Sequence, residues 1–333
     1  MDPAASLVVL NYNGRNWLSG CLGAIAAQRG APPFETIMVD NGSTDGSVAA
    51  VRGSWPAVRI IEAGTNLGFA GGNNAGAREA RGAWLVFLNN DTVPEPDWLA
   101  RLHAEAVAQP ACALVTSRLV FMDDPAVIDS AGDGYLRAGG AFKHGHGGRA
   151  DDFAASREVF GACGGAFMIR REAFEALGGF DPRFFMNYED VDLSYRARLC
   201  GMRTWYAASA IVRHAGGGSL GVVSAAAVFY GQRNLEWTWI KNTPPGLMAS
   251  TALPHVIYSL AGVAHYIAAG RGMAALRGKW AALREWRSVL ADRAAVQAAR
   301  TAANADLERF MEPNWLAAKR REKAFASTRR SAG

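Results

Sequence analysis

Three groups of acidic residues in this chain have the side-chain types and spacing for group-transfer chemistry. Asp40 and Asp91 each follow an apolar run of strand length, and Glu189 and Asp190 lie together in a later polar segment. In open α/β folds, the carboxyl ends of parallel strands face one crevice, where ligands bind. We therefore expect one site, in which one carboxylate binds a nucleoside, another a metal and a third accepts a proton.

A turn rich in glycine and asparagine lies between the first two acids. Residues 66–76 read Asn-Leu-Gly-Phe-Ala-Gly-Gly-Asn-Asn-Ala-Gly and lead into a predicted helix. Because N–H groups at a helix start attract phosphate and ribose oxygens, we expect Asn66 and Asn73 to contact a nucleotide. Tight packing of the turn is the alternative. Neither GxGxxG after the first strand nor GxxxxGK[ST] is present, which argues against dehydrogenases and P-loop nucleotidases.

Strands and helices alternate in the N-terminal half of the chain. This alternation predicts an α/β fold with a mostly parallel central sheet flanked by helices. Residues 118–160 are rich in glycine and are expected to form loops and short strands, in which His144 and His146 are solvated. The strands are expected at Ser6–Asn11, Thr36–Val39, Val58–Glu62, Trp84–Leu88, Gly165–Arg170 and Thr204–Ala207.

Composition places the chain among ordinary globular proteins. The four cysteines of its 333 residues include no CxxC pair, so buried thiols are expected rather than disulfides or a zinc site. The N-terminus has no secretory signal pattern, and a cytoplasmic location is expected. After Gly270 the chain has 14 Lys and Arg against 6 Asp and Glu, a net charge of +8, so the remaining 21 against 24 give −3.

An apolar segment precedes this basic region. Residues 242–270 contain no Lys, Arg, Asp or Glu. Apolar residues such as Leu253 and Leu260 share one helical face, whereas His255 and Ser259 lie on another. An amphipathic helix followed by basic residues favours a position in the membrane interface. A helix packed in the protein core is the alternative for the segment, and nucleic-acid binding or a solvated helix face for the basic tail.

The ordered set of motifs resembles the family 2 glycosyltransferases over roughly residues 5–220. Within that family it resembles the bacterial dTDP-rhamnosyltransferases of cell-surface glycan synthesis. The resemblance implies a GT-A fold, with a nucleotide-sugar-binding and catalytic domain over 1–235. Residues 236–333 would then be a helical, basic, membrane-associating segment.

The resemblance also implies roles in donor binding. Tyr12 and Asn13 would lie beside the base, and Asp40 would accept a hydrogen bond from the base or the ribose, unless it only caps a turn. The family's metal motif is Asp-x-Asp, and here its first acid is Asn89. The donor-binding set is therefore expected to comprise Tyr12, Asn13, Asp40, Asn66, Asn73, Asn89, Asn90 and Asp91.

A divalent metal is expected at the donor diphosphate. Asp91 remains as the main carboxylate for a hard, oxygen-ligated Mg²⁺ or Mn²⁺, although it could instead cap the following loop. The resemblance adds His214 as a metal ligand. A loop hydrogen bond is the alternative for this histidine.

Asp190 is expected to be the catalytic base. An acceptor hydroxyl attacking the anomeric carbon needs a carboxylate to receive its proton, and the dipole at a helix start would keep Asp190 ionised. Glu189 would orient Asp190 or meet the acceptor. One base without a second nucleophile implies inversion of configuration. Arg233 and Lys241 are candidates for meeting an acceptor diphosphate.

These expectations combine into one function. The reaction would transfer a hexose, best guess L-rhamnose from dTDP-rhamnose, onto a sugar hydroxyl of a polyprenyl-diphosphate-linked glycan. Galactofuranosyl, mannosyl or other hexosyl transfer, from a dTDP- or UDP-sugar, is the nearest alternative. A catalytically silent sugar-nucleotide-binding protein is the alternative from another class. The protein would be peripheral at the inner face of the cell membrane and would not bind nucleic acid.

Overall fold

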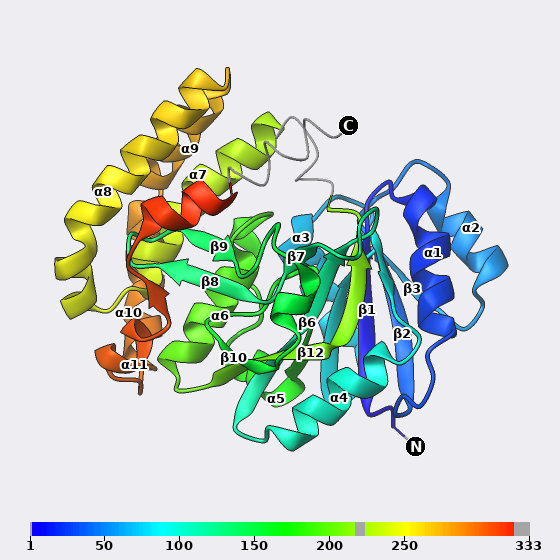
Figure 1. The fold of residues 1–333 in the computed structure, drawn as a ribbon. Coiled ribbons are helices and arrows are strands. Elements are labelled where there is room, and N and C mark those ends of the chain that lie inside the picture. Colours follow the sequence, from blue (N-terminus) through cyan, green and yellow to red (C-terminus); the bar gives the residue numbers. More distant parts are fainter. Residues whose placement is uncertain (1, 217–223, 323–333) are drawn as a thin grey trace.

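The hydrophobic strands assemble into one ten-stranded sheet in the computed structural model of this chain, shown in Figure 1. The structure describes residues 2–216 and 224–322. The strands of this sheet are β1 (Ala5–Asn11), β2 (Phe34–Asp40), β3 (Arg59–Glu62), β4 (Trp84–Asn89), β5 (Thr92–Pro94), β6 (Cys112–Phe121), β7 (Ile128–Ser130), β10 (Arg157–Val159), β11 (Ala166–Arg170) and β12 (Arg203–His214).

The main path of the sheet has the order β10-β12-β6-β11-β4-β1-β2-β3. Strands β3, β2, β1 and β4 are parallel to one another. Beyond β4 the sheet is mixed, because β11 is antiparallel to both β4 and β6. A second sheet contains β8 (Asp133–Leu136), β9 (Ala141–Lys143) and β13 (Met311–Glu312).

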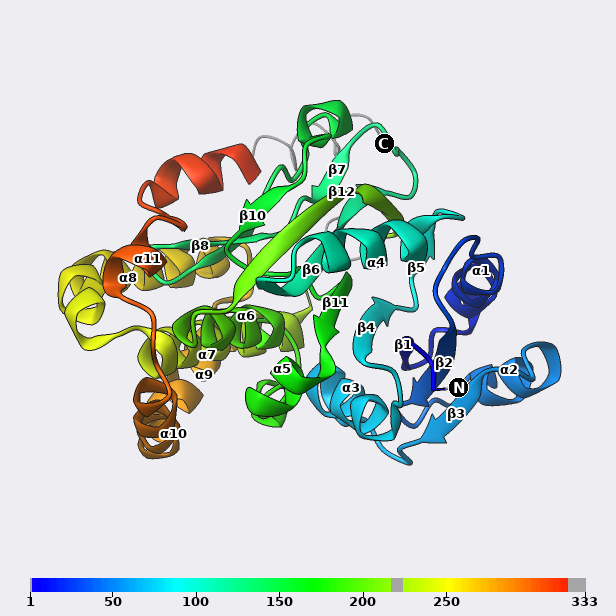
Figure 2. The ribbon, with the colours of Figure 1, turned by 90° about the horizontal axis from the view of Figure 1, so that it is seen from below.

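Two hydrophobic layers cover the sheet because its central strands are apolar on both faces. One layer packs α1, α2 and α4 against the sheet, and the other packs α3, α5 and α6 (Figure 2). These helices, with two 3₁₀ turns, are α1 (Arg15–Ala26), α2 (Ser47–Ser54), α3 (Gly68–Glu79), α4 (Trp98–Ala108), α5 (Arg171–Ala176), α6 (Glu189–Leu199), η1 (Ala150–Phe153) and η2 (Pro182–Phe184).

The C-terminal part is helical, and Figure 1 shows α8 and α9 side by side at the end of the molecule remote from α1 and α2. Helix α7 packs against α6, α9 and α10. The α/β fold with its C-terminal helical segment is confirmed. The division at residue 235 stays a prediction, and it falls inside α7. The helices are α7 (Ala225–Asn242), α8 (Pro245–Ala268), α9 (Gly272–Arg284), α10 (Trp286–Ala298) and α11 (Asn304–Glu308).

Candidate active site

The ends of three parallel strands bring the first group of predicted residues together. Asn11 lies opposite Asp40, and Leu10 lies opposite Asn89. Asn11, which the sequence reasoning missed, connects Asp40 with Asn90. Its Nδ2 donates to Oδ1 of Asp40 at 3.1 Å, and its Oδ1 accepts from Nδ2 of Asn90 at 2.9 Å. A polar residue closing a buried strand was the available signal.

The carboxylate of Asp40 also shapes the turn that follows β2. Its Oδ2 accepts hydrogen bonds from the N–H groups of Gly42 and Ser43, at 3.1 and 3.0 Å. Asn13, at φ 52°, pins the same turn by accepting the N–H of Thr44 at 2.8 Å. Beside this turn the side chain of Tyr12 is 51% exposed. The structure thus gives Asp40 and Asn13 turn-forming contacts and presents one aromatic ring to solvent.

The two asparagines of the glycine-rich turn make local contacts. Oδ1 of Asn66 accepts the N–H of Gly68 at 2.8 Å, and Nδ2 of Asn73 donates to the carbonyl of Phe69 at 3.0 Å. The N–H of Phe69 donates to the carbonyl of Phe185 at 2.6 Å. A Cβ on Gly68 would lie 2.4 Å from that carbonyl oxygen. This glycine therefore allows the turn to contact the loop that precedes Glu189.

His214 lies between two carboxylates. Its Nε2 is 3.3 Å from Oδ1 of Asp91, and its Nδ1 is 2.8 Å from Oδ2 of Asp129. Strand pairing explains the first contact, because β12 places His214 opposite Thr92 on β5. Burial alone lowers the pKa of His214, but the hydrogen bonds with Asp129 and Asp91 outweigh it and raise this pKa to about 9.

Asp129 is completely buried and anchors the histidine. Nζ of Lys143 donates to both carboxylate oxygens of Asp129 at 2.9 Å. Burial opposes ionisation of Asp129, yet the charge of Lys143 and the bonds from His146 and His214 hold its pKa well below the usual range. Sequence reasoning missed Asp129 and Lys143, because no motif links either residue to His214, which lies 85 positions after Asp129.

His144 and His146 are partly buried rather than solvated. Nδ1 of His146 lies 2.8 Å from the carbonyl oxygen of Asp129, and the ring of His144 packs edge-on against Phe142. Burial, together with the charges of Arg157 and Arg321, lowers the pKa of His144 to about 4.

The Glu189–Asp190 pair opens α6, as expected. Oδ2 of Asp190 accepts the N–H of Gly164 at 2.8 Å, and Oδ1 accepts the N–H of Val191 at 2.8 Å. Burial raises the pKa of Asp190, although the hydrogen bonds from the N–H groups of Gly164 and Val191 oppose this shift. A raised pKa makes a carboxylate a better proton acceptor.

Two further carboxyl groups lie close to Asp190. Oε2 of Glu189 and Oδ1 of Asp133 are buried without a hydrogen-bond partner. Burial and the charge of Asp190 raise the pKa of both well above their usual range. Asp133, on the same hairpin as Lys143, was not expected at the site. Of the three carboxyl groups, Asp190 is the one that is partly exposed and whose two oxygens both accept backbone hydrogen bonds.

Arg233 and Lys241 have internal partners. The guanidinium of Arg233 donates to the carbonyls of Arg183 and Phe184 and stacks 4.1 Å from the ring of Trp237. Nζ of Lys241 is 2.9 Å from Asp181 and 3.0 Å from Asp192. Both cations are buried. These contacts hold α7 against the segment that carries the Glu189–Asp190 pair.

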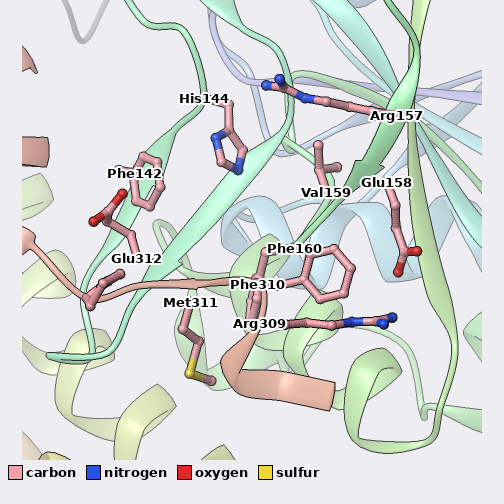
Figure 3. Close-up of a pocket in the computed structure, with 11 residues that line it drawn as sticks. Phe142, His144, Arg157, Glu158, Val159, Phe160, Arg309, Phe310, Met311 and Glu312 are labelled. Atoms are coloured by element: carbon pink, nitrogen blue, oxygen red, sulfur yellow. The ribbon is translucent and has the colours of Figure 1, made fainter. Parts of the chain in front are cut away.

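A cavity of about 330 Å³, shown in Figure 3, is lined by none of the residues expected to bind donor or metal or to act in catalysis. Phe142, His144, Phe160 and Phe310 line it. Because side chains alternate along β9, Phe142 faces away from Lys143 and hence from the Asp129–His214 pair. Glu158 at its edge is paired with Arg203 and Arg198. The cavity is therefore not part of the candidate site.

Residues 6–178 match the family model described as glycosyl transferase family 2. The chain is 29% identical over 211 residues to the O-antigen biosynthesis protein RfbC of Myxococcus xanthus, with 60% of this chain and 16% of that protein covered. It is 31% identical over 205 residues to the N-acetylglucosaminyl-diphospho-decaprenol L-rhamnosyltransferase of Mycobacterium tuberculosis, with 55% and 66% covered. The chain thus spans less than two thirds of each relative.

Two solved structures share the fold. The mannosyltransferase PcManGT of Pyrobaculum calidifontis, in complex with GDP-Man and Mn²⁺, superposes with a TM-score of 0.52 at 22% identity, covering 90% of this chain and 86% of that one. GalNAc-T7, with UDP, GalNAc and Mn²⁺, gives 0.54 at 15% identity, covering 80% and 58%. With its fold, its strand-end site and a family match over more than half its length, this chain belongs to glycosyl transferase family 2.

Proposed function

We propose that this chain is an inverting glycosyltransferase that moves a hexose, L-rhamnose from dTDP-rhamnose as the leading candidate, onto a sugar hydroxyl of a polyprenyl-diphosphate-linked glycan. The proximity of Asp190 to the Asp91–His214 pair carries the proposal: Asp190 accepts the N–H of Gly164, and a Cβ on the next residue, Gly165, would lie 3.8 Å from the His214 ring. In the reaction, Asp190 accepts the proton of the attacking hydroxyl. The mycobacterial relative, at 31% identity, supports glycosyl transfer as the kind of reaction, and its name suggests the sugar and the polyprenyl-linked acceptor to be tested first.

The donor would lie along the ends of β1, β2 and β4. Tyr12 offers a ring for the base, and Asp40 and Asn13 shape the neighbouring turn. Asn66 and Asn73 belong to the turn before α3 and to its first turns, where N–H groups favour phosphate oxygens. Asn89 and Asn90 complete the edge beside Asp91. Galactofuranose and mannose remain the alternatives for the transferred sugar.

The residues around His214 fit a divalent metal. With the Nδ1–H of a neutral His214 donated to Asp129, Nε2 would turn a lone pair toward Oδ1 of Asp91 at 3.3 Å. Two such electron-pair donors repel unless a proton or a cation lies between them. The described residues contain no group of three or more His, Cys, Asp or Glu arranged as a metal site. Asp91 and His214 would thus be two ligands of Mg²⁺ or Mn²⁺, and the donor diphosphate would supply others. The ion would offset the negative charge of the departing nucleoside diphosphate.

Metal binding should depend on pH through His214. Its pKa of about 9 lies above the ordinary value of 6.5, so below pH 9 the ion must displace a proton. We expect the apparent affinity for Mn²⁺ to rise by up to about tenfold for each pH unit from pH 6.5 to 8.5. Calorimetric titration in buffers of different ionisation enthalpy would measure both the affinity and the proton release. An affinity independent of pH over this range would contradict the assignment of His214.

A panel of donors tests the proposed reaction. Thermal unfolding with dTDP-, UDP- and GDP-sugars, each with and without Mn²⁺, should single out one donor. A donor at 100 times its dissociation constant stabilises the folded state by about 2.7 kcal/mol. Transfer to a synthetic polyprenyl-diphosphate disaccharide should then follow with the same donor. Donor binding without transfer or donor hydrolysis would favour a silent sugar-nucleotide-binding protein.

We also propose that α8 and α9 lie on an anionic membrane surface. Within the described residues, α8 alone is long and apolar enough to cross a bilayer by length and composition. Its polar residues face inward, because His255 and Ser259 each bond Glu236 at 2.8 Å. Its apolar residues face outward, with Leu253 and Leu260 70% and 64% exposed. This orientation favours a helix in the interface over one packed in a core.

Introducing negative charge on this surface, at Leu260 of α8 and at Trp280, which is exposed on α9, should release the protein from lipid. A variant combining Leu260→Glu with Trp280→Glu should lose most of its co-sedimentation with phosphatidylglycerol vesicles, since it removes buried apolar area and repels anionic headgroups. High salt should weaken wild-type binding only partly, because apolar burial is not screened. Val107→Glu is the matched control, since Val107 is 59% exposed on the distant helix α4. Wild-type protein that stays in solution at low salt would overturn the membrane assignment.

A further inference from the structure

The loop before the Glu189–Asp190 pair has an unusual backbone. Phe185 has φ 62° and ψ −60°, and the N–H of Met186 donates to the carbonyl of Phe184 at 2.7 Å. These values describe a γ-turn of the rarer, strained type. Asn187 and Tyr188 follow with φ of 65° and 73°. Non-glycine residues seldom adopt positive φ, so surrounding contacts must impose this conformation.

Asn234 on α7 supplies such contacts from one completely buried side chain. Its Nδ2 donates to the carbonyls of three residues of the loop. The acceptors are Phe184 at 2.9 Å, Met186 at 2.9 Å and Asn187 at 2.7 Å. Its Oδ1 accepts from Nε of Arg233 at 3.0 Å. Because the three carbonyl oxygens can only accept and Nε of Arg233 can only donate, the network sets which end of the Asn234 amide is nitrogen and which is oxygen.

The opposite side of the loop meets the glycine-rich turn. The carbonyl of Phe185 accepts the N–H of Phe69 at 2.6 Å, and Gly68 leaves room for that approach. The loop is thus held between the start of α3 and helix α7. Since α6 begins at Glu189, the conformation of the loop determines where Asp190 enters the site.

We infer that Asn234 is a positioning residue for the reaction: it keeps the backbone of residues 184–187 in the strained conformation that places Asp190 at the acceptor hydroxyl. Asn234 acts through Asp190 and touches no substrate. This inference rests on the proposed transferase function and on Asp190 as its base. A displacement of the base by about 1 Å is enough to cost roughly 100-fold in rate.

Turnover measured per folded molecule tests the inference. Asn234→Ala should lower kcat by roughly 10- to 100-fold, while the donor dissociation constant changes less than about threefold. Asn234→Ser, which keeps one hydroxyl donor, should fall between wild type and Asn234→Ala. Thr238→Val is the matched control, because Thr238 is equally buried on α7 and its Oγ1 has no partner. Its kcat should equal that of wild type.

The decisive readout is the combination with Asp190→Asn. If Asn234 acts only by placing the base, Asn234→Ala should lower the residual turnover of Asp190→Asn by less than about threefold, because residues acting as a unit are not additive. Multiplicative losses would show a general structural role and overturn the inference, as would an unchanged kcat in Asn234→Ala. Should Asn234→Ala not fold, Asn234→Ser carries the same two comparisons. Wild-type protein without turnover on any donor would instead overturn the proposed function.

Discussion

Replacing Asp190 by asparagine should lower turnover by about 10²- to 10⁴-fold, the usual contribution of a general base. The amide keeps the size of the side chain but cannot take the proton of the acceptor hydroxyl. One of the two backbone hydrogen bonds, from Gly164 or Val191, will also be lost, because an amide has one acceptor oxygen. Donor affinity should remain within a few fold, since the donor would contact the strand ends. Steady-state transfer kinetics and donor titration measure the two quantities.

Glu189→Gln is the matched control for this variant. The pKa of Glu189 is raised well above its usual range by burial and by Asp190. This shift favours the protonated carboxyl, whose size and neutrality glutamine reproduces, so turnover should fall by less than about tenfold. Near-normal turnover in Asp190→Asn together with a large loss in Glu189→Gln would exchange the roles of the two residues.

Replacing Asp91 by alanine should weaken Mn²⁺-dependent donor binding by more than roughly 100-fold. Groups that only orient a metal ligand are already worth about 10- to 100-fold, and Asp91 would supply the negative charge of the site. His214→Ala should weaken binding less, because a neutral ligand is lost. Calorimetric titration of the donor with and without Mn²⁺ distinguishes these outcomes.

Asp97→Ala provides the comparison for Asp91→Ala. Asp97 lies six positions further along and pairs with Arg101 at the surface. The Asp97→Ala variant should bind donor in the presence of metal as tightly as wild type does. Activity that survives complete removal of divalent ions by EDTA would remove the metal role from both Asp91 and His214.

Local sequence patterns were sufficient to predict the parallel half of the sheet. Each of its strands has apolar residues at its centre, so β1, β2, β3 and β4 were expected within about two residues of their observed limits. The mixed half of the sheet was harder to predict from sequence, because the lengths of β6 and β12 depend on pairing between segments that are distant in the chain. The expected strand Thr204–Ala207 is the first part of β12, which continues to His214.

The same distinction applies to the candidate site. Asp40, Asp91 and Asp190 stand at ends of regular elements, and the sequence shows such ends directly. Asp129 and Lys143 belong to the glycine-rich segment, and their partner His214 lies on a strand far along the chain. Only the tertiary fold brings these groups within hydrogen-bonding distance. Physical contacts of this kind leave no periodic signal in a single sequence.

Helix α7 limits how this protein can be divided. Asn234 and Lys241 on α7 hold the segment that contains the candidate base, and His255 on α8 lies 3.0 Å from the carbonyl oxygen of Ala138 on the β8–β9 turn. A chimera joined at residue 235 would keep Asn234 but replace Lys241 and the rest of the helix. A segment taken from a relative should therefore begin after Asn242. That incoming segment must carry an equivalent of His255 to contact the carbonyl of Ala138. The helical part thus shares contacts with the segment that carries the candidate site and is not a separately attached unit.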